Sequence, residues 1–467
     1  MSDKIEINSA YIEELTSLIE AQNSKELISR IEELHIADIA EIIEDLSLEN
    51  AKYLFELISD EEKSAAVLVE LEDDTREELL EDLSAKEIAK EVIDNLESDD
   101  AADLIGELSE DKKEEVLSHI EDEELASDIS DLLTYPEDTA GGLMAKELIK
   151  VNENWNTVQC LKEMRKQADD VKKVYTIYVV DDNDKLLGLL SLRKLLLTER
   201  STSIKDIITT DIISVKATTD DEDVANIMQK YDLVALPVID DLGRLIGRIT
   251  VDDVMDVAKE EAEKDYQMAS GISEDVESSD SVWELTRARL PWLLIGMMGG
   301  LLGAEVIGIF DLKENLELAF FIPLIAAMGG NVGVQSAAIV VQGLANDSLK
   351  MENLFQKLIK ELGVGLLNGF ICSVIILGAA FGLGYSIELS LTVSISLLAV
   401  IVFAAVFGTF IPLTLEKYKI DPALATGPFI TTVNDVLGLF IYFWIGKAIL
   451  LHGYGIENIF RFIRAIL

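Results

Sequence analysis

One carboxylate, Asp435, lies inside a long apolar run near the end of the chain, where an ionisable side chain is costly and marks a functional site by default. If the run is helical, small residues share the face of Asp435 at successive turns. They are Gly427, Thr431 and Gly438. A narrow polar stripe around one acid suits a cation pathway. The alternative is close helix packing, with Asp435 bound by the hydroxyl of Thr431 or Thr432.

A second apolar run contains GGNVGVQS at residues 329–336. Its glycines allow another backbone to approach closely, and the amides of Asn331 and Gln335 share one helical face at i and i+4. Both features suit the lining of an ion path, although a helix-packing patch would use the same glycines. Glu305, a further carboxylate within a run, lies nearer the outer end, where a long side chain can reach the membrane interface.

Five apolar runs position these residues, and each is long enough at ~1.5 Å per residue to cross a hydrocarbon core of about 30 Å. They cover residues 291–310, 318–344, 362–387, 389–415 and 422–446. Lysine and arginine flank them unevenly, with seven on the side of the N-terminus and four on the other. The four are Lys313, Lys447, Arg461 and Arg464. The positive-inside rule predicts a cytoplasmic N-terminus and a C-terminus outside.

The part of the chain before these runs is strongly acidic. Residues 291–467 contain 12 acidic and 9 basic residues, so that of a net charge of −48, about −45 falls on residues 1–290. Such a field repels nucleic acid and anionic lipid and concentrates cations, although a solvated acidic surface has the same composition. The two cysteines, Cys160 and Cys372, exclude a disulfide framework, and the first 20 residues do not resemble a signal peptide. We expect this part to stay in the cytoplasm.

Residues 1–133 are predicted to form short amphipathic helices. Leucine-flanked segments begin at Leu71, Leu83 and Leu96, and Ser84 and Ser98 occupy positions typical of helix caps. Helices this short cannot bury their apolar stripes alone. We therefore expect an all-α array in which neighbouring helices stack in a superhelix.

A turn-rich junction, YPEDTAGGLM at residues 135–144, precedes an internal repeat. YVVDDNDKLLGLLSLRKLL from Tyr178 matches PVIDDLGRLIGRITVDDVM from Pro237 at an offset of 59 residues, and each copy has a strand, turn, strand and helix pattern. The pattern resembles a tandem pair of CBS domains, at about 140–198 and 204–256, which implies a regulatory module that binds adenine nucleotides such as ATP. A polar amphipathic segment, residues 252–285, leads into the first apolar run.

The resemblance extends over the whole chain. GGNxGxQ in the second span and DPALxxxPxxxTxxDxxGxxxY in the fifth resemble the MgtE family of Mg²⁺ channels, as does the order of the parts. It implies a multidomain fold. The parts are an all-α N-terminal domain (1–133), an α/β CBS module (134–251), a connecting plug helix (252–285) and a five-helix membrane domain (286–467).

The resemblance also implies a plasma-membrane homodimer with the pore on its two-fold axis and Asp435 as the pore carboxylate. Asn331 and Gln335 are candidate pore-lining residues. Mg²⁺ prefers an octahedron of oxygens and gives up water reluctantly, so one or two carboxylates plus retained waters suffice to hold it. One aspartate per chain, doubled by a two-fold axis, supplies that ring. Mg²⁺ bound to the acidic domains would close the pore, as negative feedback.

Sensor residues follow from the same resemblance. They are Asp99 and Asp103 in the helical domain, Glu222 and Asp232 in the second CBS unit, Asp253, Asp256, Glu261 and Asp265 in the connecting helix, and Asp421 before the last span. Two positions depart from the family pattern: Lys264 and Tyr53 each stand where an acid is expected.

Rival functions leave features of the sequence unexplained. An intramembrane metalloprotease needs an HExxH motif or its equivalent, and none surrounds His35, His119 or His452. An anion channel is disfavoured by an aspartate-lined path, and a membrane-anchored nucleotide sensor would not need Asp435. The alternative that stays open is a broader divalent cation transporter, for Co²⁺, Ni²⁺ or Mn²⁺, regulated by adenine nucleotide at the CBS pair.

Overall fold

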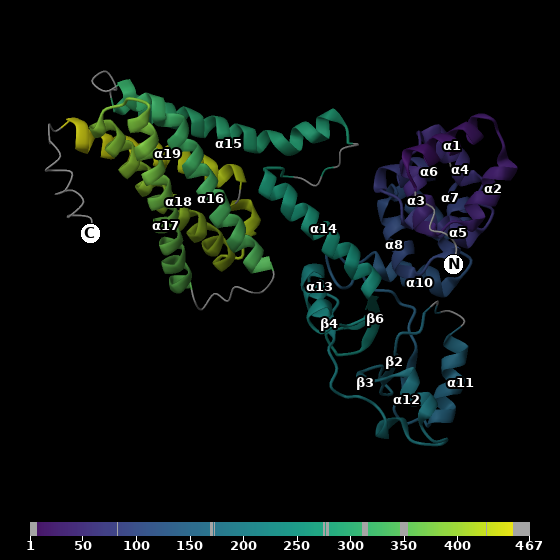
Figure 1. The fold of residues 1–467 in the computed structure, drawn as a ribbon. Coiled ribbons are helices and arrows are strands. Elements are labelled where there is room, and N and C mark those ends of the chain that lie inside the picture. The colour runs from purple at the N-terminus through teal and green to yellow at the C-terminus, as the bar shows by residue number, and fades with distance from the viewer. Residues whose placement is uncertain are drawn as a thin grey trace. The chain divides into compact units, whose positions relative to one another are not determined.

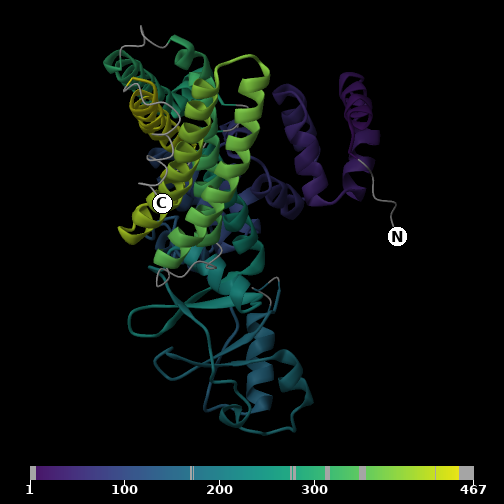
Figure 2. The ribbon, with the colours of Figure 1, turned by 60° about the vertical axis from the view of Figure 1, so that its left-hand side comes forward.

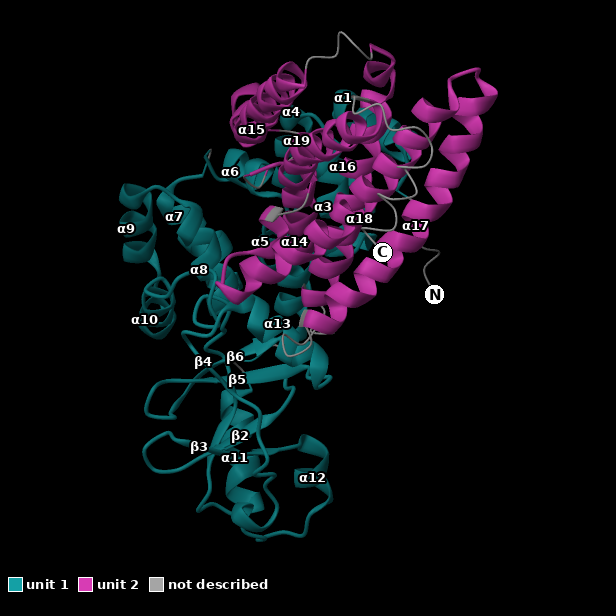
Figure 3. Cartoon of the chain, turned by 90° about the vertical axis from the view of Figure 1, so that its left-hand side faces the viewer, with its two compact units in different colours: residues 1–259 teal, residues 260–467 magenta. Residues whose placement is uncertain are grey.

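The computed structural model describes residues 7–81, 83–168, 171, 173–273, 276, 280–310, 316–345, 354–425 and 427–451. The chain divides into two compact units, residues 1–259 and residues 260–467, which Figure 3 shows in different colours. Several residues used for topology and motif arguments lie outside the described part: Lys313, Lys350, His452, Arg461 and Arg464.

The first 133 residues form the predicted array of short helices (Figures 1 and 2). Each buries one stripe, as α2 does with Leu27 and Ile31, and packs on helices near it in sequence, such as α3 on α5 and α8 on α10. The helices are α1 (Ser9–Glu20), α2 (Ser24–Glu33), α3 (Ile36–Glu44), α4 (Leu48–Glu56), α5 (Glu61–Val69), α6 (Asp73–Glu81), α7 (Ala85–Glu87), α8 (Ser98–Glu107), α9 (Glu110–His119) and α10 (Glu123–Leu132), with η1 (Ile88–Val92) and η2 (Ile93–Asn95) continuing α7.

One of the two predicted helix caps is wrong. Ser84 caps α7 in a full capping box with Glu87. Ser98, in contrast, is the first residue of α8 and makes no cap: its hydroxyl donates a hydrogen bond of 2.8 Å to the Glu147 carboxylate. The Ser98 oxygen accepts instead from the amide of Lys146 at 2.9 Å, so both hydrogen-bonding roles of the hydroxyl are directed to Lys146 and Glu147 and not to the helix.

The two CBS units have the same sheet. The strand orders are β1-β2-β3 and β4-β5-β6, each with one parallel and one antiparallel pair. In both sheets the antiparallel ladder is irregular at the same place, between Val179 and Val180 and between Val238 and Ile239. The elements are β1 (Lys150–Asn152), α11 (Thr157–Gln167), β2 (Ile177–Val180), β3 (Leu186–Leu190), α12 (Leu192–Leu197), η3 (Ile204–Asp206), β4 (Val215–Lys216), α13 (Asp221–Lys230), β5 (Ala235–Ile239) and β6 (Leu245–Thr250).

The two CBS units meet through equivalent residues. Lys185 pairs with Arg244, its counterpart in the repeat, in an isolated bridge. The amide of Leu186 donates to the Gly243 carbonyl at 3.1 Å, and the amide of Leu245 donates to the Asp184 carbonyl at 2.9 Å. Each bond maps onto the other at the offset of 59 residues. The repeat predicted from sequence is thus a pair of like folds about an approximate two-fold axis.

The connecting helix, α14 (Val251–Ser270), is shorter than the predicted segment 252–285. It ends because Gly271 adopts a φ of +83°, which a side chain would disfavour. The next helix, α15, starts at Val282, so the last residues of the predicted segment belong to the first membrane helix.

Five helices of the second unit have the length and hydropathy of membrane spans, as predicted. Among them α18 is the most buried, and it packs on α16, α17 and α19. They are α15 (Val282–Ile309), α16 (Ile322–Ala345) after η5 (Leu316–Phe321), α17 (Leu354–Gly382), α18 (Ile387–Lys417) and α19 (Gly427–Gly446), which continues as η8 (Lys447–Leu451).

The last span is shorter than the predicted run 422–446. Pro422–Ala425 form a separate 3-10 turn, η7, and α19 begins only at Gly427, which has a φ of +48°. Pro428 therefore occupies the first turn of α19, where its missing N–H removes no helical hydrogen bond.

Candidate functional site

The α19 face that carries Asp435 lies against the glycine segment of α16. A Cβ atom on Gly330 would lie 3.3 Å from the Thr431 methyl carbon and 4.0 Å from Asp435 Oδ1. Asp435 is half-buried, and within the described part of the chain no group donates a hydrogen bond to its carboxylate. The Thr431 hydroxyl donates instead to the Gly427 carbonyl at 3.0 Å. A single chain thus leaves the Asp435 oxygens open to a ligand.

The glycines of α16 do pack against other helices. Gly333 has no room for a side chain, since its Cβ would overlap the buried Asn434 amide of α19 and its carbonyl lies directly on Gly408 of α18. A Cβ atom on Gly329 would lie 3.1 Å from Cγ1 of Val400 on α18. Asn331 and Gln335, by contrast, are exposed on the outer side of α16. The glycines of this segment therefore pack against other helices, whereas Asn331 and Gln335 of the same segment stay exposed.

Glu305 and Glu361 differ in their surroundings on the membrane helices. Glu305 is exposed on α15. Glu361, in the second turn of α17, accepts a hydrogen bond of 2.6 Å from the Ser336 hydroxyl at the end of the glycine segment. Sequence reasoning missed Glu361, because it precedes the apolar run 362–387. The helix α17 starts earlier, at Leu354, and so includes it.

In the first unit, the predicted sensor residues Asp99 and Asp253 come together. Asp99 is 8% exposed, and burial raises its pKa well above the ordinary value, with further contributions from the negative charges of Asp100 and Asp253. Burial also raises the pKa of Asp253, although the amide of Thr250 donates to its carboxylate at 2.9 Å. Two acids that repel each other in a buried place are suited to bind a shared cation.

Residues that the sequence analysis did not identify hold this pair in place. The amide and hydroxyl of Ser98 both donate to the Glu147 carboxylate, at 3.0 and 2.8 Å. The buried Arg248 guanidinium pairs with Glu97 at 3.1 Å. These contacts join α8 to the CBS units next to Asp99. The sequence did contain a signal for Arg248, since it is the one charged residue within the apolar strand β6.

The remaining sensor candidates of the first unit stay apart. Glu222 lies in the first turn of α13 and Asp232 lies two residues beyond its end, so about 12 Å of helix separates them at ~1.5 Å per residue. Asp103 on α8 and Asp256 on α14 are exposed. Tyr53, which stands where the family pattern has an acid, shares a hydrogen bond of 2.8 Å with Ser24. Among the described residues, no group of three or more His, Cys, Asp or Glu could hold a metal ion.

A second group of acids lies at the start of α19. Burial raises the pKa of Asp265, and the charges of Asp421 and Glu261 raise it further. Lys264 forms an ion pair of 2.9 Å with Glu261. The Asp421 carboxylate accepts a hydrogen bond of 2.7 Å from the Ala423 amide, which fixes it before η7.

The end of α14 packs against the first turn of α19. The carbonyl of Ala269 lies where a Cβ on Gly427 would point, and the Pro428 ring lies within 3.1 Å of the equivalent position on Gly271. A movement of the end of α14 would therefore act directly on the helix that carries Asp435.

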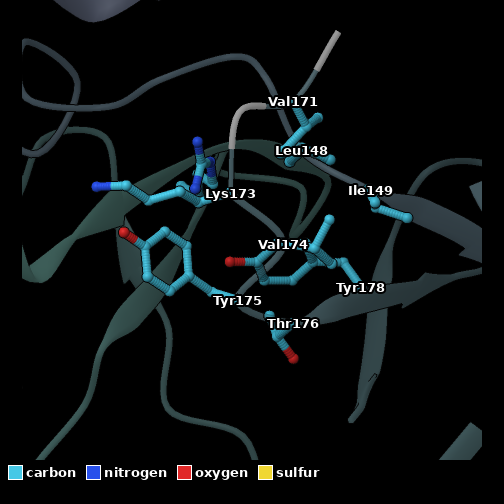
Figure 4. Close-up of a pocket in the computed structure, with 9 residues that line it drawn as sticks. Leu148, Ile149, Val171, Lys173, Val174, Tyr175, Thr176 and Tyr178 are labelled. Atoms are coloured by element: carbon cyan, nitrogen blue, oxygen red, sulfur yellow. The ribbon is translucent and has the colours of Figure 1, made fainter. Parts of the chain in front are cut away.

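The CBS pair contains a small pocket between its two halves (Figure 4). Aliphatic and aromatic side chains form most of its lining, with Lys173 and Arg248 as its cations. The Arg248 guanidinium stacks at 5.5 Å from the Tyr175 ring centre. The buried Tyr178 hydroxyl has no hydrogen-bond partner among the described residues, and burial raises its pKa to about 12. The free volume of the pocket is only about 10 Å³, room for a single water, so a flat ring with an anionic group would enter only after the lining side chains move.

Comparison with family models divides the chain into three parts. Residues 34–138 match the MgtE intracellular N domain, residues 140–199 and 204–260 match CBS domains, and residues 322–445 match the divalent cation transporter model MgtE.

Whole proteins are also similar. The magnesium transporter MgtE of Thermus thermophilus is 36% identical over 323 residues, 68% of this chain and 72% of that protein. The magnesium transporter MgtE of Bacillus subtilis is 33% identical over 319 residues, 68% of this chain and 71% of that protein. A crystal structure of the cytosolic domain of the Mg²⁺ channel MgtE in complex with ATP is 32% identical, with a TM-score of 0.49, and covers 53% of this chain and 99% of that one.

Proposed function

Since this chain belongs to the MgtE family of magnesium transporters, we propose that it conducts Mg²⁺ across the plasma membrane and is closed by Mg²⁺ on its cytoplasmic side. The main support for this proposal is the Asp435 carboxylate. It is half-buried in the five-helix bundle beside Gly330 and accepts no hydrogen bond in the described part of the chain. The N-terminus is cytoplasmic and the C-terminus lies outside.

The path runs between two copies of the chain. Five spans are too few to enclose a pore comfortably, and exposed amides at Asn331 and Gln335 would be unfavourable against lipid. In a homodimer with a two-fold axis near Asp435, the two carboxylates form a ring that holds a largely hydrated Mg²⁺, and the four amides face the same water-filled path. One carboxylate per chain binds the ion without retaining it.

Cytoplasmic Mg²⁺ closes the path by neutralising acids that crowd together. One group is Asp99 with Asp253, beside Asp100 and Asp252. The second is Glu261, Asp265 and Asp421, where α14 meets α19. Glu222 and Asp232 bind an ion only with the corresponding residues of the partner subunit, because α13 separates them within one chain.

These sites have few carboxylates and should be weak, with dissociation constants on the order of 10⁻⁴–10⁻³ M. The compact, Mg²⁺-bound arrangement corresponds to the closed pore. A ligand favours the state that it binds more tightly. Mg²⁺ entry is therefore self-limiting only if the state that binds cytoplasmic Mg²⁺ more tightly is the closed one.

Ion uptake into liposomes tests this function. The wild-type protein should take up Mg²⁺ in the presence of excess Na⁺ and Ca²⁺. Asp435→Asn keeps the shape but removes the charge and should lower uptake at least tenfold, whereas Glu305→Gln removes an exposed carboxylate from the same bundle and should not. Co²⁺, Ni²⁺ and Mn²⁺ as competitors separate an Mg²⁺-selective path from a broader divalent one. Wild-type uptake by correctly assembled Asp435→Asn would remove Asp435 from the path.

The pocket of the CBS pair supports a second ligand, an adenine nucleotide such as ATP. The aromatic and aliphatic lining suits the base, the unpartnered Tyr178 hydroxyl offers it a hydrogen bond, and the Lys173 ammonium suits the phosphates, whereas Arg248 is engaged by Glu97. Lys173→Gln should weaken ATP binding by the full-length protein, measured by fluorescence with a labelled nucleotide, while Lys166→Gln on the outside of α11 should not.

A further inference from the structure

A lysine lies within the acidic group where α14 meets α19. Glu261 and Asp265 come from the last turns of α14, and Asp421 precedes η7. Lys264 reaches Glu261 at 2.9 Å, and its positive charge opposes the effect of Asp421 and Glu261 on Asp265. Its ammonium is thus within electrostatic range of at least two of the three carboxylates.

These carboxylates oppose the packing of α14 on α19. The contacts of Ala269 with Gly427 and of Gly271 with Pro428 hold the end of α14 against the first turn of α19. The same packing brings Asp265 close to Asp421, which repel each other. Docking of α14 therefore requires positive charge at this place.

We propose that Lys264 is a built-in cation of this group, which supplies part of the charge that docking requires and so reduces the number of Mg²⁺ ions taken up when α14 docks. Three carboxylates carry three negative charges, Lys264 leaves two, and one Mg²⁺ cancels those two. The inference rests on the proposal that Mg²⁺ neutralises Glu261, Asp265 and Asp421, which among the described residues do not by themselves form a group arranged to hold a metal ion.

Because the lysine is covalently attached, its charge is present at every Mg²⁺ concentration. Docking should then persist in part without Mg²⁺ and should respond gradually as Mg²⁺ rises. Without the lysine, docking depends on bound ions alone. The Mg²⁺-free state is then less docked, and the dependence on Mg²⁺ is steeper, since more ions bind to the docked state.

Hydrogen exchange of the amides of residues 262–270, followed by mass spectrometry on the full-length protein in nanodiscs, measures this docking. Without Mg²⁺, these amides should exchange about two- to fivefold faster in Lys264→Gln than in the wild type, which is the effect expected from losing a partly exposed ion pair. The variant should also give a steeper slope of log exchange rate against log Mg²⁺ concentration at constant ionic strength. Lys264→Glu should enlarge both effects.

A matched control is Lys166→Gln. Lys166 pairs with Glu163 at 3.1 Å and at the same i, i+3 spacing, but in the first CBS unit, so its replacement should change neither the rate nor the slope at residues 262–270. If wild type responds to Mg²⁺ and Lys264→Gln behaves identically, the inference is wrong and the Mg²⁺ site stands. If wild-type exchange does not respond to Mg²⁺, the proposed sensor fails, and this inference fails with it.

Discussion

In the proposed sensor, protons and Mg²⁺ compete for the buried acids of the first unit. Burial raises the pKa of both Asp99 and Asp253, and the Asp253 charge adds to the shift of Asp99. A raised pKa in the folded state means that the folded protein holds protons that the unfolded chain, with aspartate pKa values near 3.9, has already released. Without Mg²⁺, stability is therefore highest at low pH and decreases as the pH rises through the raised values.

Acidification should consequently weaken the response to Mg²⁺. As the pH falls through the raised pKa values, the Mg²⁺ concentration needed for half-maximal stabilisation of the full-length protein in thermal unfolding should increase, by at most about tenfold per pH unit for each displaced proton. Protonation of these acids should at the same time add to the stability of the Mg²⁺-free protein. Asp99→Asn should reduce both effects because it removes one titrating carboxylate. A Mg²⁺ midpoint independent of pH in the wild type would contradict this account.

Close packing of helices decides the shape of the membrane domain at the scale of elements. The glycine segment of α16 lies on α18 through Gly333 and Gly408, and on α19 through Gly330 and Gly333. The three helices can approach this closely only where side chains are absent. That approach places Asp435 beside Gly330, so the segment that assembles the bundle also adjoins the carboxylate of the proposed path.

Substitutions at two glycines should separate packing from helix propensity. Gly333→Ala introduces a Cβ that overlaps Asn434 and should destabilise the protein by about 1–3 kcal/mol. Gly300→Ala, on α15, meets no atom within 4 Å and should be neutral or stabilising by up to ~1 kcal/mol through helix propensity. Thermal unfolding in detergent measures both. Equal effects would show that the contact of Gly333 with α19 is not tight.

At the scale of the whole molecule, charge is the dominant property. Residues 1–290 carry about −45 per chain, which a dimer doubles, so that the acidic parts repel one another when no counter-ion is bound. Mg²⁺ offsets this repulsion at the places where acids meet, and Na⁺ at matched ionic strength only screens it. In the proposed mechanism, the acidic region is both the sensor and the source of the repulsion that opens the channel.

Removal of this sensor should leave the channel open. Deletion of residues 1–133, or joint neutralisation of Asp99, Asp253 and Asp256 to asparagine, should preserve ion flux at internal Mg²⁺ concentrations that close the wild type. Patch recordings from reconstituted membranes measure this. Neutralising three exposed acids of α9, Asp111, Glu114 and Glu115, changes the charge equally and should leave closure intact. Normal closure of the deleted channel would show that the helical domain is not the sensor.

The sequence by itself determined features that depend on local periodicity. Apolar runs define the five spans, the offset of 59 residues defines the CBS pair, and the stripe around Asp435 identifies the candidate path. Helix ends were less predictable, because they depend on backbone conformation at single residues. Gly271 ends α14 and Gly427 starts α19, each at a positive φ.

Only the tertiary structure decided which polar groups meet. Ser98 bonds to Glu147, 49 residues away, and Arg248 pairs with Glu97, 151 residues away. No helical or strand period relates such positions, since the pairing is set by how α8 packs on the CBS units. The same holds for Ser336 with Glu361 and for Asp265 with Asp421. In an acidic chain almost any carboxylate could serve as a sensor, and packing alone selects those that are buried beside one another.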